Sequence, residues 1–150
     1  MSDYWIILIP AQADFIPTTE ARRDALRLFR ALAPRAAEVK EELTEDVRFI
    51  DCGSNFEHVR CPDCDEELKM AWWQEKMDEE AKGGFPLRSF DLPCCDGRSS
   101  LERLKYDWPQ GFARFSIEAE DPIIADLTVE QLQAFEAILG CRVRRILRHI

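Results

Sequence analysis

The sequence is poor in the residues that enzyme active sites most often need. Its only two histidines are His58 and His149, so a Ser-His-Asp or Cys-His arrangement would have to use one of them. His58 stands three residues before a cysteine and is better suited to supporting it, and His149 is the penultimate residue of a β-rich end. The glycine pair Gly83-Gly84 follows a predicted helix and lacks the Walker lysine, which excludes a phosphate-binding loop. These absences favour a non-enzymatic protein, and we predict no catalytic residue.

Long apolar runs and a basic leader are also missing. The longest uninterrupted apolar run, residues 4–9, is far shorter than the roughly 20 residues that cross a bilayer. Asp3 precedes this run and no basic segment stands before it, which argues against a secretory signal. We therefore expect a cytoplasmic protein without a membrane partner.

The chain has no excess of basic residues either. Its 29 acidic and 20 basic side chains give a net charge of −9, whereas nucleic-acid binders usually present a basic face. This balance argues against a nucleic-acid partner and favours a protein partner with a basic surface. One acidic run spans residues 38–46, and we predict that its Glu41, Glu42 and Glu45 belong to the partner surface.

Cysteine, in contrast, is plentiful, and its spacing is that of a metal site. In a chain without an export signal, six cysteines favour metal binding over disulfides. Residues 61–64 (Cys-Pro-Asp-Cys) form a knuckle in which two thiolates on a tight turn can hold one ion, and residues 93–95 (Pro-Cys-Cys) look like its partner. Zinc prefers four ligands in a tetrahedron and accepts thiolates readily. We predict a zinc ion bound by Cys61, Cys64, Cys94 and Cys95.

The adjacent cysteine pair leaves the ligand set open. Neighbouring residues of an extended strand point to opposite faces, so Cys94 and Cys95 can reach one ion only if the chain turns there, which the Asp-Gly pair after them permits. Otherwise Cys52 or His58 could supply the fourth ligand. Four thiolates leave no open coordination position, so the zinc is expected to be structural, whereas a three-cysteine site could activate water.

Several short strings of the sequence resemble a group of small bacterial proteins of uncharacterised function. The strings are residues 52–55 (Cys-Gly-Ser-Asn), 61–64, 93–95 and 106–112 (Tyr-Asp-Trp-Pro-Gln-Gly-Phe). The resemblance covers most of the chain, implies a bacterial cytoplasmic protein, supports the paired cysteines as a motif and implies no known activity. The chain departs from zinc ribbons at Asp65, where these often have glycine, and at Asp96 before Gly97.

Hydrophobic periodicity predicts an α+β fold. Strands are predicted at residues 4–9, 47–52, 112–119 and 141–150, and helices at 19–32 and between Thr128 and Gly140. Strand, helix, strand, strand, helix, strand is the order of a ferredoxin-like βαββαβ antiparallel sheet, in which the first and third strands are central. The wholly apolar strand 4–9 fits a central position.

The middle of the chain differs in composition from the rest. Residues 53–110 hold four of the six cysteines and three of the four tryptophans. We predict that residues 1–150 form a single domain and that 53–110 is a zinc-ribbon-like, zinc-binding subdomain inserted between the second and third strands. Residues 66–82 are expected to form a helix on which Trp73 contributes to the partner surface.

Three functions remain open at this point. The first is a non-enzymatic, zinc-stabilised protein-binding module, such as an inhibitor or immunity-type protein for a basic bacterial partner. The second is a small enzyme or ligand-binding domain with a pocket between the sheet and the insertion. The third is a zinc-ribbon nucleic-acid binder that uses the Arg-rich C-terminal strand, with its arginines Arg142, Arg144, Arg145 and Arg148.

Overall fold

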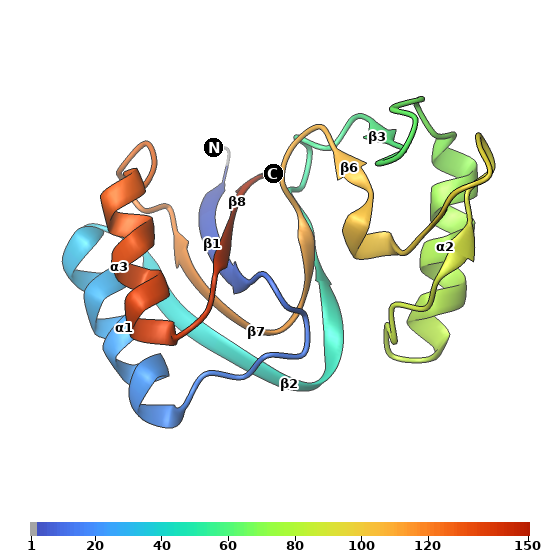
Figure 1. Ribbon diagram of the computed structural model, residues 1–150. Helices are drawn as coiled ribbons and strands as arrows, with labels where there is room; N and C mark the ends of the chain where they lie inside the picture. Colours follow the sequence, from blue (N-terminus) through green and yellow to red (C-terminus); the bar gives the residue numbers. More distant parts are fainter. Residues whose placement is uncertain (1–2) are drawn as a thin grey trace.

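The computed structural model describes residues 3–150 and contains a four-stranded antiparallel sheet in the order β2-β7-β1-β8 (Figure 1). The central strands are β1 (Tyr4–Pro10) and β7 (Gly111–Glu120), and the edge strands are β2 (Glu38–Ile50) and β8 (Val143–His149). Ile6 to Ile9 are buried, which explains why β1 is apolar on both faces. No helix among residues 3–150 is long and apolar enough to cross a membrane.

Two helices, α1 (Thr19–Leu32) and α3 (Val129–Leu139), cover one face of this sheet (Figure 1). Thr128 and Gln131 form a capping box at the start of α3, and Gly140 ends the helix with a left-handed φ of 75°. The rings of Phe29 and Phe135 meet edge to face at 5.3 Å, and both side chains are fully buried. The first core therefore lies between the helices and the sheet.

β2 differs from the strand predicted at residues 47–52, because it begins at Glu38 and includes the acidic run. Pairing with β7 outweighs the low strand propensity of the charged residues, and an edge position leaves their side chains in water. The register also shifts: Leu43 pairs with Phe115 and Arg48 with Ala113, so residues 44–47 bulge opposite Arg114. This bulge redirects the side chains of the middle of β2.

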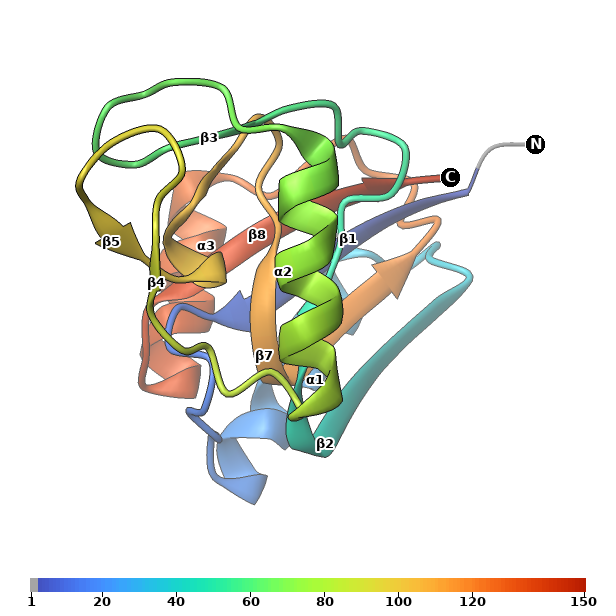
Figure 2. The same cartoon turned by 90° about the vertical axis from the view of Figure 1, so that its right-hand side faces the viewer.

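The segment between β2 and β7 contains small elements around one helix (Figure 2). These elements are β3 (Val59–Arg60), α2 (Met70–Lys82), β4 (Phe90–Asp91), β5 (Arg98–Ser99), the 3-10 helix η1 (Leu101–Arg103) and β6 (Lys105–Tyr106). α2 starts at Met70 and not at residue 66, because the preceding residues extend along β3, where Leu68 N–H donates to Val59 O at 2.8 Å.

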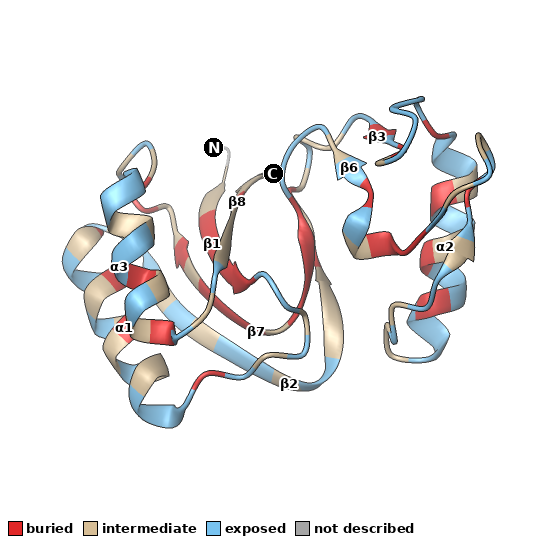
Figure 3. Cartoon of the chain, in the orientation of Figure 1, coloured by how far each residue is buried: buried red, intermediate tan, exposed pale blue. Residues whose placement is uncertain are grey.

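A second core joins this segment to the sheet, and it corrects the expectation for Trp73. Trp73 is only 5% exposed, so it does not lie on a partner surface. Figure 3 shows buried positions on α2 among exposed ones. The Trp73 ring packs edge to face on Phe49 of β2 at 5.8 Å and on Phe56 at 5.0 Å. Its indole N–H donates to Tyr106 Oη at 3.2 Å. The side chain thus anchors α2 to the sheet.

Candidate functional site

The first cysteine knuckle is a tight turn whose N–H groups point at one sulfur. The backbone N–H groups of Asp63 and Cys64 donate to Cys61 Sγ at 3.3 and 3.4 Å, and Asp65 N–H donates to Cys61 O at 3.0 Å. Asp65 has a left-handed φ of 65°, the conformation for which zinc ribbons use glycine at this point. Two N–H donors stabilise a thiolate at Cys61, as metal binding requires.

The second pair of cysteines lies at the tip of the β4–β5 hairpin. Phe90 pairs with Ser99, and Leu92 N–H donates to Gly97 O at 3.0 Å, which closes the loop. The chain bends over residues 93–96, so Cys94 and Cys95 face the same point despite being adjacent. The turn that the sequence required between these two cysteines is present.

The four predicted cysteines lie together and could hold a metal ion. Their Sγ atoms are all within 4.8 Å of one another; Cys64 and Cys94 are separated by 3.4 Å, and Cys61 and Cys95 by 3.9 Å. Four sulfurs at about 2.3 Å from a zinc ion would lie about 3.8 Å apart in a regular tetrahedron. The separations in the structure are close to that value, and none of the four thiols forms a disulfide. The geometry therefore fits a four-thiolate metal centre.

The electrostatics of the cluster favour a cation. Burial opposes ionisation of the Cys61 thiol, but the N–H groups of Cys64 and Asp63 outweigh it and lower the pKa of Cys61 to about 7. Burial, followed by hydrogen bonding to the neighbouring thiols and the charge on Cys61, raises the pKa of Cys94. One thiolate thus hinders ionisation of the next unless a positive ion lies between them.

The alternative ligands lie outside the four-cysteine cluster. Cys52 follows β2 and is buried in a core cluster with Ile50, and its N–H and its thiol both approach Gln110 Oε1, at 3.1 and 3.3 Å. His58 Nδ1 contacts Glu67, and its ring groups with Glu57 and Asp107 in an exposed cluster. Neither residue is among the cysteine ligand atoms that gather within 4.8 Å.

The predicted acidic surface follows β2, but its members differ in how far they are neutralised. Glu41 pairs with Arg22 at 3.5 Å, and Glu42 pairs with Arg48 at 3.2 Å. Glu45 is exposed on the bulge and has no ion-pair partner among residues 3–150. Among the carboxylates of β2, exposed charge that is unpaired within residues 3–150 therefore remains at the bulge and at Glu38, where the strand begins.

The Arg-rich C-terminal strand is largely engaged inside the chain. Arg145 pairs with Asp126, and Arg148 pairs with Asp51 at 3.2 Å and lies 5.9 Å from the centre of the Trp5 ring. These contacts use cations that a nucleic-acid surface would need to leave free.

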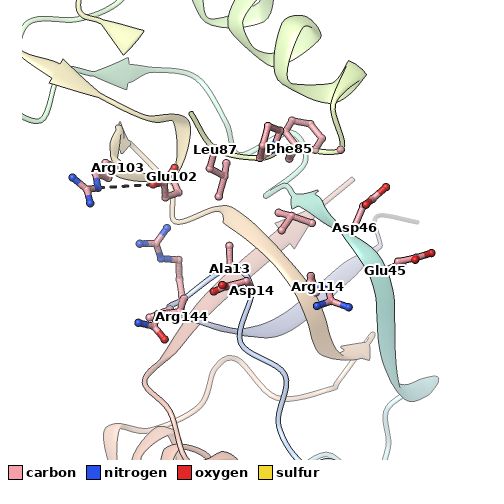
Figure 4. A pocket seen from close by; sticks show the side chains of 15 residues that line it. Ala13, Asp14, Glu45, Asp46, Phe85, Leu87, Glu102, Arg103, Arg114 and Arg144 are labelled. Carbon is pink, nitrogen blue, oxygen red and sulfur yellow. Dashed lines mark ion pairs between the residues drawn. The ribbon is translucent and has the colours of Figure 1, made fainter. Parts of the chain in front are cut away.

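A cavity of about 660 Å³ lies between the sheet and the segment 53–110, beside the bulge of β2. Figure 4 shows Arg144 and Asp14 on one side of it, and Arg114 with Glu45 and Asp46 at the other. The loop 84–87 closes the cavity from the side of α2. Sequence reasoning located a pocket in this general place but missed its residues, because the strand pairing and loop that assemble them have no periodic signal.

Comparisons of the chain with protein-family models, with curated proteins and with solved structures found no match.

Proposed function

We propose that this protein is a non-enzymatic, zinc-stabilised module that binds a protein with a basic surface, as an inhibitor or immunity-type protein would. The observation that carries the proposal is a set of three carboxylates around the cavity, with Asp14 on one side and Glu45 and Asp46 on the other. None of the three forms an ion pair among residues 3–150. Unpaired carboxylates of one sign attract a basic partner over a distance set by the salt concentration.

The scaffold of this module is a ferredoxin-like fold with a zinc-binding insertion at residues 53–110. The sheet order β2-β7-β1-β8 and the two helices on one face support the βαββαβ assignment. The four-cysteine cluster supports zinc, since thiolates select soft metals and four of them leave no open position for catalysis. The zinc is structural: it holds a small, loop-rich segment whose apolar surface alone is limited.

Metal content is the first test of this proposal. Protein purified from a reducing cytosol without added metal should contain about one equivalent of zinc by elemental analysis. A Cys64→Ser/Cys94→Ser double variant should lose the metal and unfold the segment 53–110. Native protein with a disulfide between these cysteines, or without metal, would contradict the zinc assignment.

Charge reversal tests the partner surface. The folded protein is immobilised, and the bacterial proteins that it retains are identified. The binding of each retained protein is then measured by titration. Replacing Glu41, Glu42 and Glu45 with lysine should slow association with a basic partner by about 10-fold or more at low salt and leave the zinc content unchanged. The matched control replaces Glu75, Asp78 and Glu79, which are exposed on α2, with lysine. It changes the net charge by the same amount as the β2 triple variant. Equal loss in both triple variants would show only a net-charge effect and reject the β2 surface.

A small-ligand domain is the second candidate, and the cavity is the specific observation that favours it. Its volume of about 660 Å³ falls in the range of small-molecule sites. Two results together would select this candidate: the protein binds a small molecule, and the Glu41, Glu42 and Glu45 triple variant binds every protein partner as well as the wild type does.

A further inference from the structure

The cavity combines unpaired groups of both signs. Two guanidinium groups, Arg114 on β7 and Arg144 on β8, line it without a carboxylate partner among residues 3–150. Arg114 Nε donates to Thr44 O at 3.1 Å, and one terminal nitrogen of Arg144 donates to Gln110 O at 2.9 Å. Each guanidinium has five N–H groups, so donors remain free on both while the backbone contacts fix their positions.

The acidic rim faces the same cavity from different elements. Asp14 comes from the loop after β1, and Glu45 and Asp46 come from the bulge of β2. These three carboxylates and the two arginines do not pair with one another within 4.0 Å. The unpaired groups sum to one net negative charge, three carboxylates against two guanidinium groups. A ligand with one carboxylate and two cationic or donor groups would satisfy them.

The wall of the cavity on the α2 side is a strained loop. Phe85 and Leu87 have φ values of 53° and 58°, a left-handed conformation that is unfavourable for residues with a side chain. The buried Glu80 carboxylate holds this loop, since it accepts hydrogen bonds from Leu87 N–H at 2.7 Å and Arg88 N–H at 3.3 Å. A carboxylate near a helix C-terminus opposes the helix dipole.

These features favour a built site over a chance hollow. Strained backbone and β-bulges cluster where a chain positions ligand-contacting groups, and here both occur on the same cavity. The Glu80 carboxylate is unfavourably placed near the C-terminus of α2, but its hydrogen bond from Leu87 N–H holds the loop in place. The arginines, the rim and the loop therefore define one recognition pocket.

We propose that this pocket binds the C-terminal residue of a basic protein, with an arginine or lysine at that terminus. The terminal carboxylate binds Arg144, whose guanidinium group can hold it in a bidentate manner. The basic side chain reaches across the cavity to Glu45 and Asp46, which lie on its other side. This inference rests on the proposed function, because the same acidic rim is what attracts the basic partner.

The test uses two fluorescein-labelled peptides, Gly-Ser-Gly-Gly-Arg with a free C-terminus and the same peptide amidated, with zinc-loaded full-length protein. The free acid should bind about 10- to 100-fold more tightly, the loss expected for one charge-assisted hydrogen-bonded pair. Arg144→Ala should abolish the difference between the two peptides, and Arg144→Lys should restore part of it. Asp46→Asn should weaken both peptides alike. Arg27→Ala and Asp24→Asn, on the exposed side of α1, serve as matched controls, and thermal unfolding checks every variant.

Three outcomes overturn the inference in distinguishable ways. Equal binding of acid and amide removes the C-terminal recognition but leaves docking of a basic protein intact. Free L-arginine that binds as tightly as the peptide assigns the pocket to a small molecule. Failure of both peptides, with a basic partner still bound by the intact protein, places the contact outside the cavity.

Discussion

Gly97 lies against the side chain of Asp63, so that a Cβ on Gly97 would clash with Asp63 Oδ2 and lie 3.2 Å from Leu92 Cδ1. The two residues belong to different knuckles: Asp63 stands between Cys61 and Cys64, and Gly97 follows the Cys94-Cys95 pair. A side chain at Gly97 would therefore force the Asp63 carboxylate to move, at the point where the two knuckles are in contact.

Gly97→Ala should weaken metal binding. The new methyl group displaces Asp63 and separates the knuckles, and changes next to metal ligands typically lower affinity by about 10- to 100-fold. Competition with a chromophoric chelator measures this. Adding Asp63→Ala to the same chain removes the clashing carboxylate and should recover most of the affinity. Gly140→Ala, which adds a methyl group with nothing within 4 Å, should leave zinc affinity unchanged.

Cys52 should keep its proton in the folded protein at pH values where an exposed thiol ionises. Burial raises the pKa of the Cys52 thiol to about 11 from its usual value near 9.0, so the protonated, unreactive form persists at pH 8. Between about pH 9 and pH 11 the unfolded thiol loses its proton, whereas the folded thiol keeps it. The contribution of Cys52 to the free energy of unfolding therefore falls as the pH rises through this range. Urea unfolding at pH 8 and pH 10.5 should show a smaller pH-dependent loss in Cys52→Ser than in the wild type. An identical loss in both proteins would contradict the assignment.

Asp65 tests the backbone of the first knuckle. Its φ of 65° disfavours side chains with a Cβ, and its contact with Lys105 at 3.2 Å is on the surface, where ion pairs contribute little. Asp65→Gly should therefore keep or raise thermal stability, whereas Asp65→Val should lower it by roughly 1–2 kcal/mol. Equal stability of the two variants would show that the turn relaxes in solution.

The parts of the structure that follow from local sequence were predictable. β1 and the helices α1 and α3 have a clear apolar period, and the Thr128 cap with Gly140 marks both ends of α3. The cysteine spacing likewise predicted the four residues that meet in the structure.

Other features depend on tertiary contacts that one sequence does not encode locally. The acidic start of β2 is a strand only because β7 pairs with it, and the bulge at 44–47 arises from the same pairing. Trp72 and Trp73 are adjacent and lie about 100° apart on a helix, so periodicity alone could not decide which one is buried. The loop at Phe85 and Leu87 is held by Glu80, a contact with no sequence signature.

The second core makes a prediction about how the molecule unfolds. Phe112 of β7 contacts Phe49 at 5.2 Å and Phe85 at 5.4 Å, so a strand of the sheet and the segment 53–110 share one apolar cluster. Phe112→Ala should lower the free energy of unfolding by about 3–5 kcal/mol and also accelerate zinc release to a chelator under native conditions. Local opening of this cluster frees the segment that holds the cysteines.

Phe135→Ala is the matched control. Phe135 is buried, as Phe112 is, but it packs on Phe29 in the core between the helices and the sheet. The variant should lower the free energy of unfolding by a similar amount, yet leave the rate of zinc release nearly unchanged while the protein stays folded. Urea titrations give the stabilities, and stopped-flow with a chelator gives the release rates. If both variants release zinc at the wild-type rate, the metal site is insulated from the sheet, and 53–110 behaves as an independent unit despite the shared core.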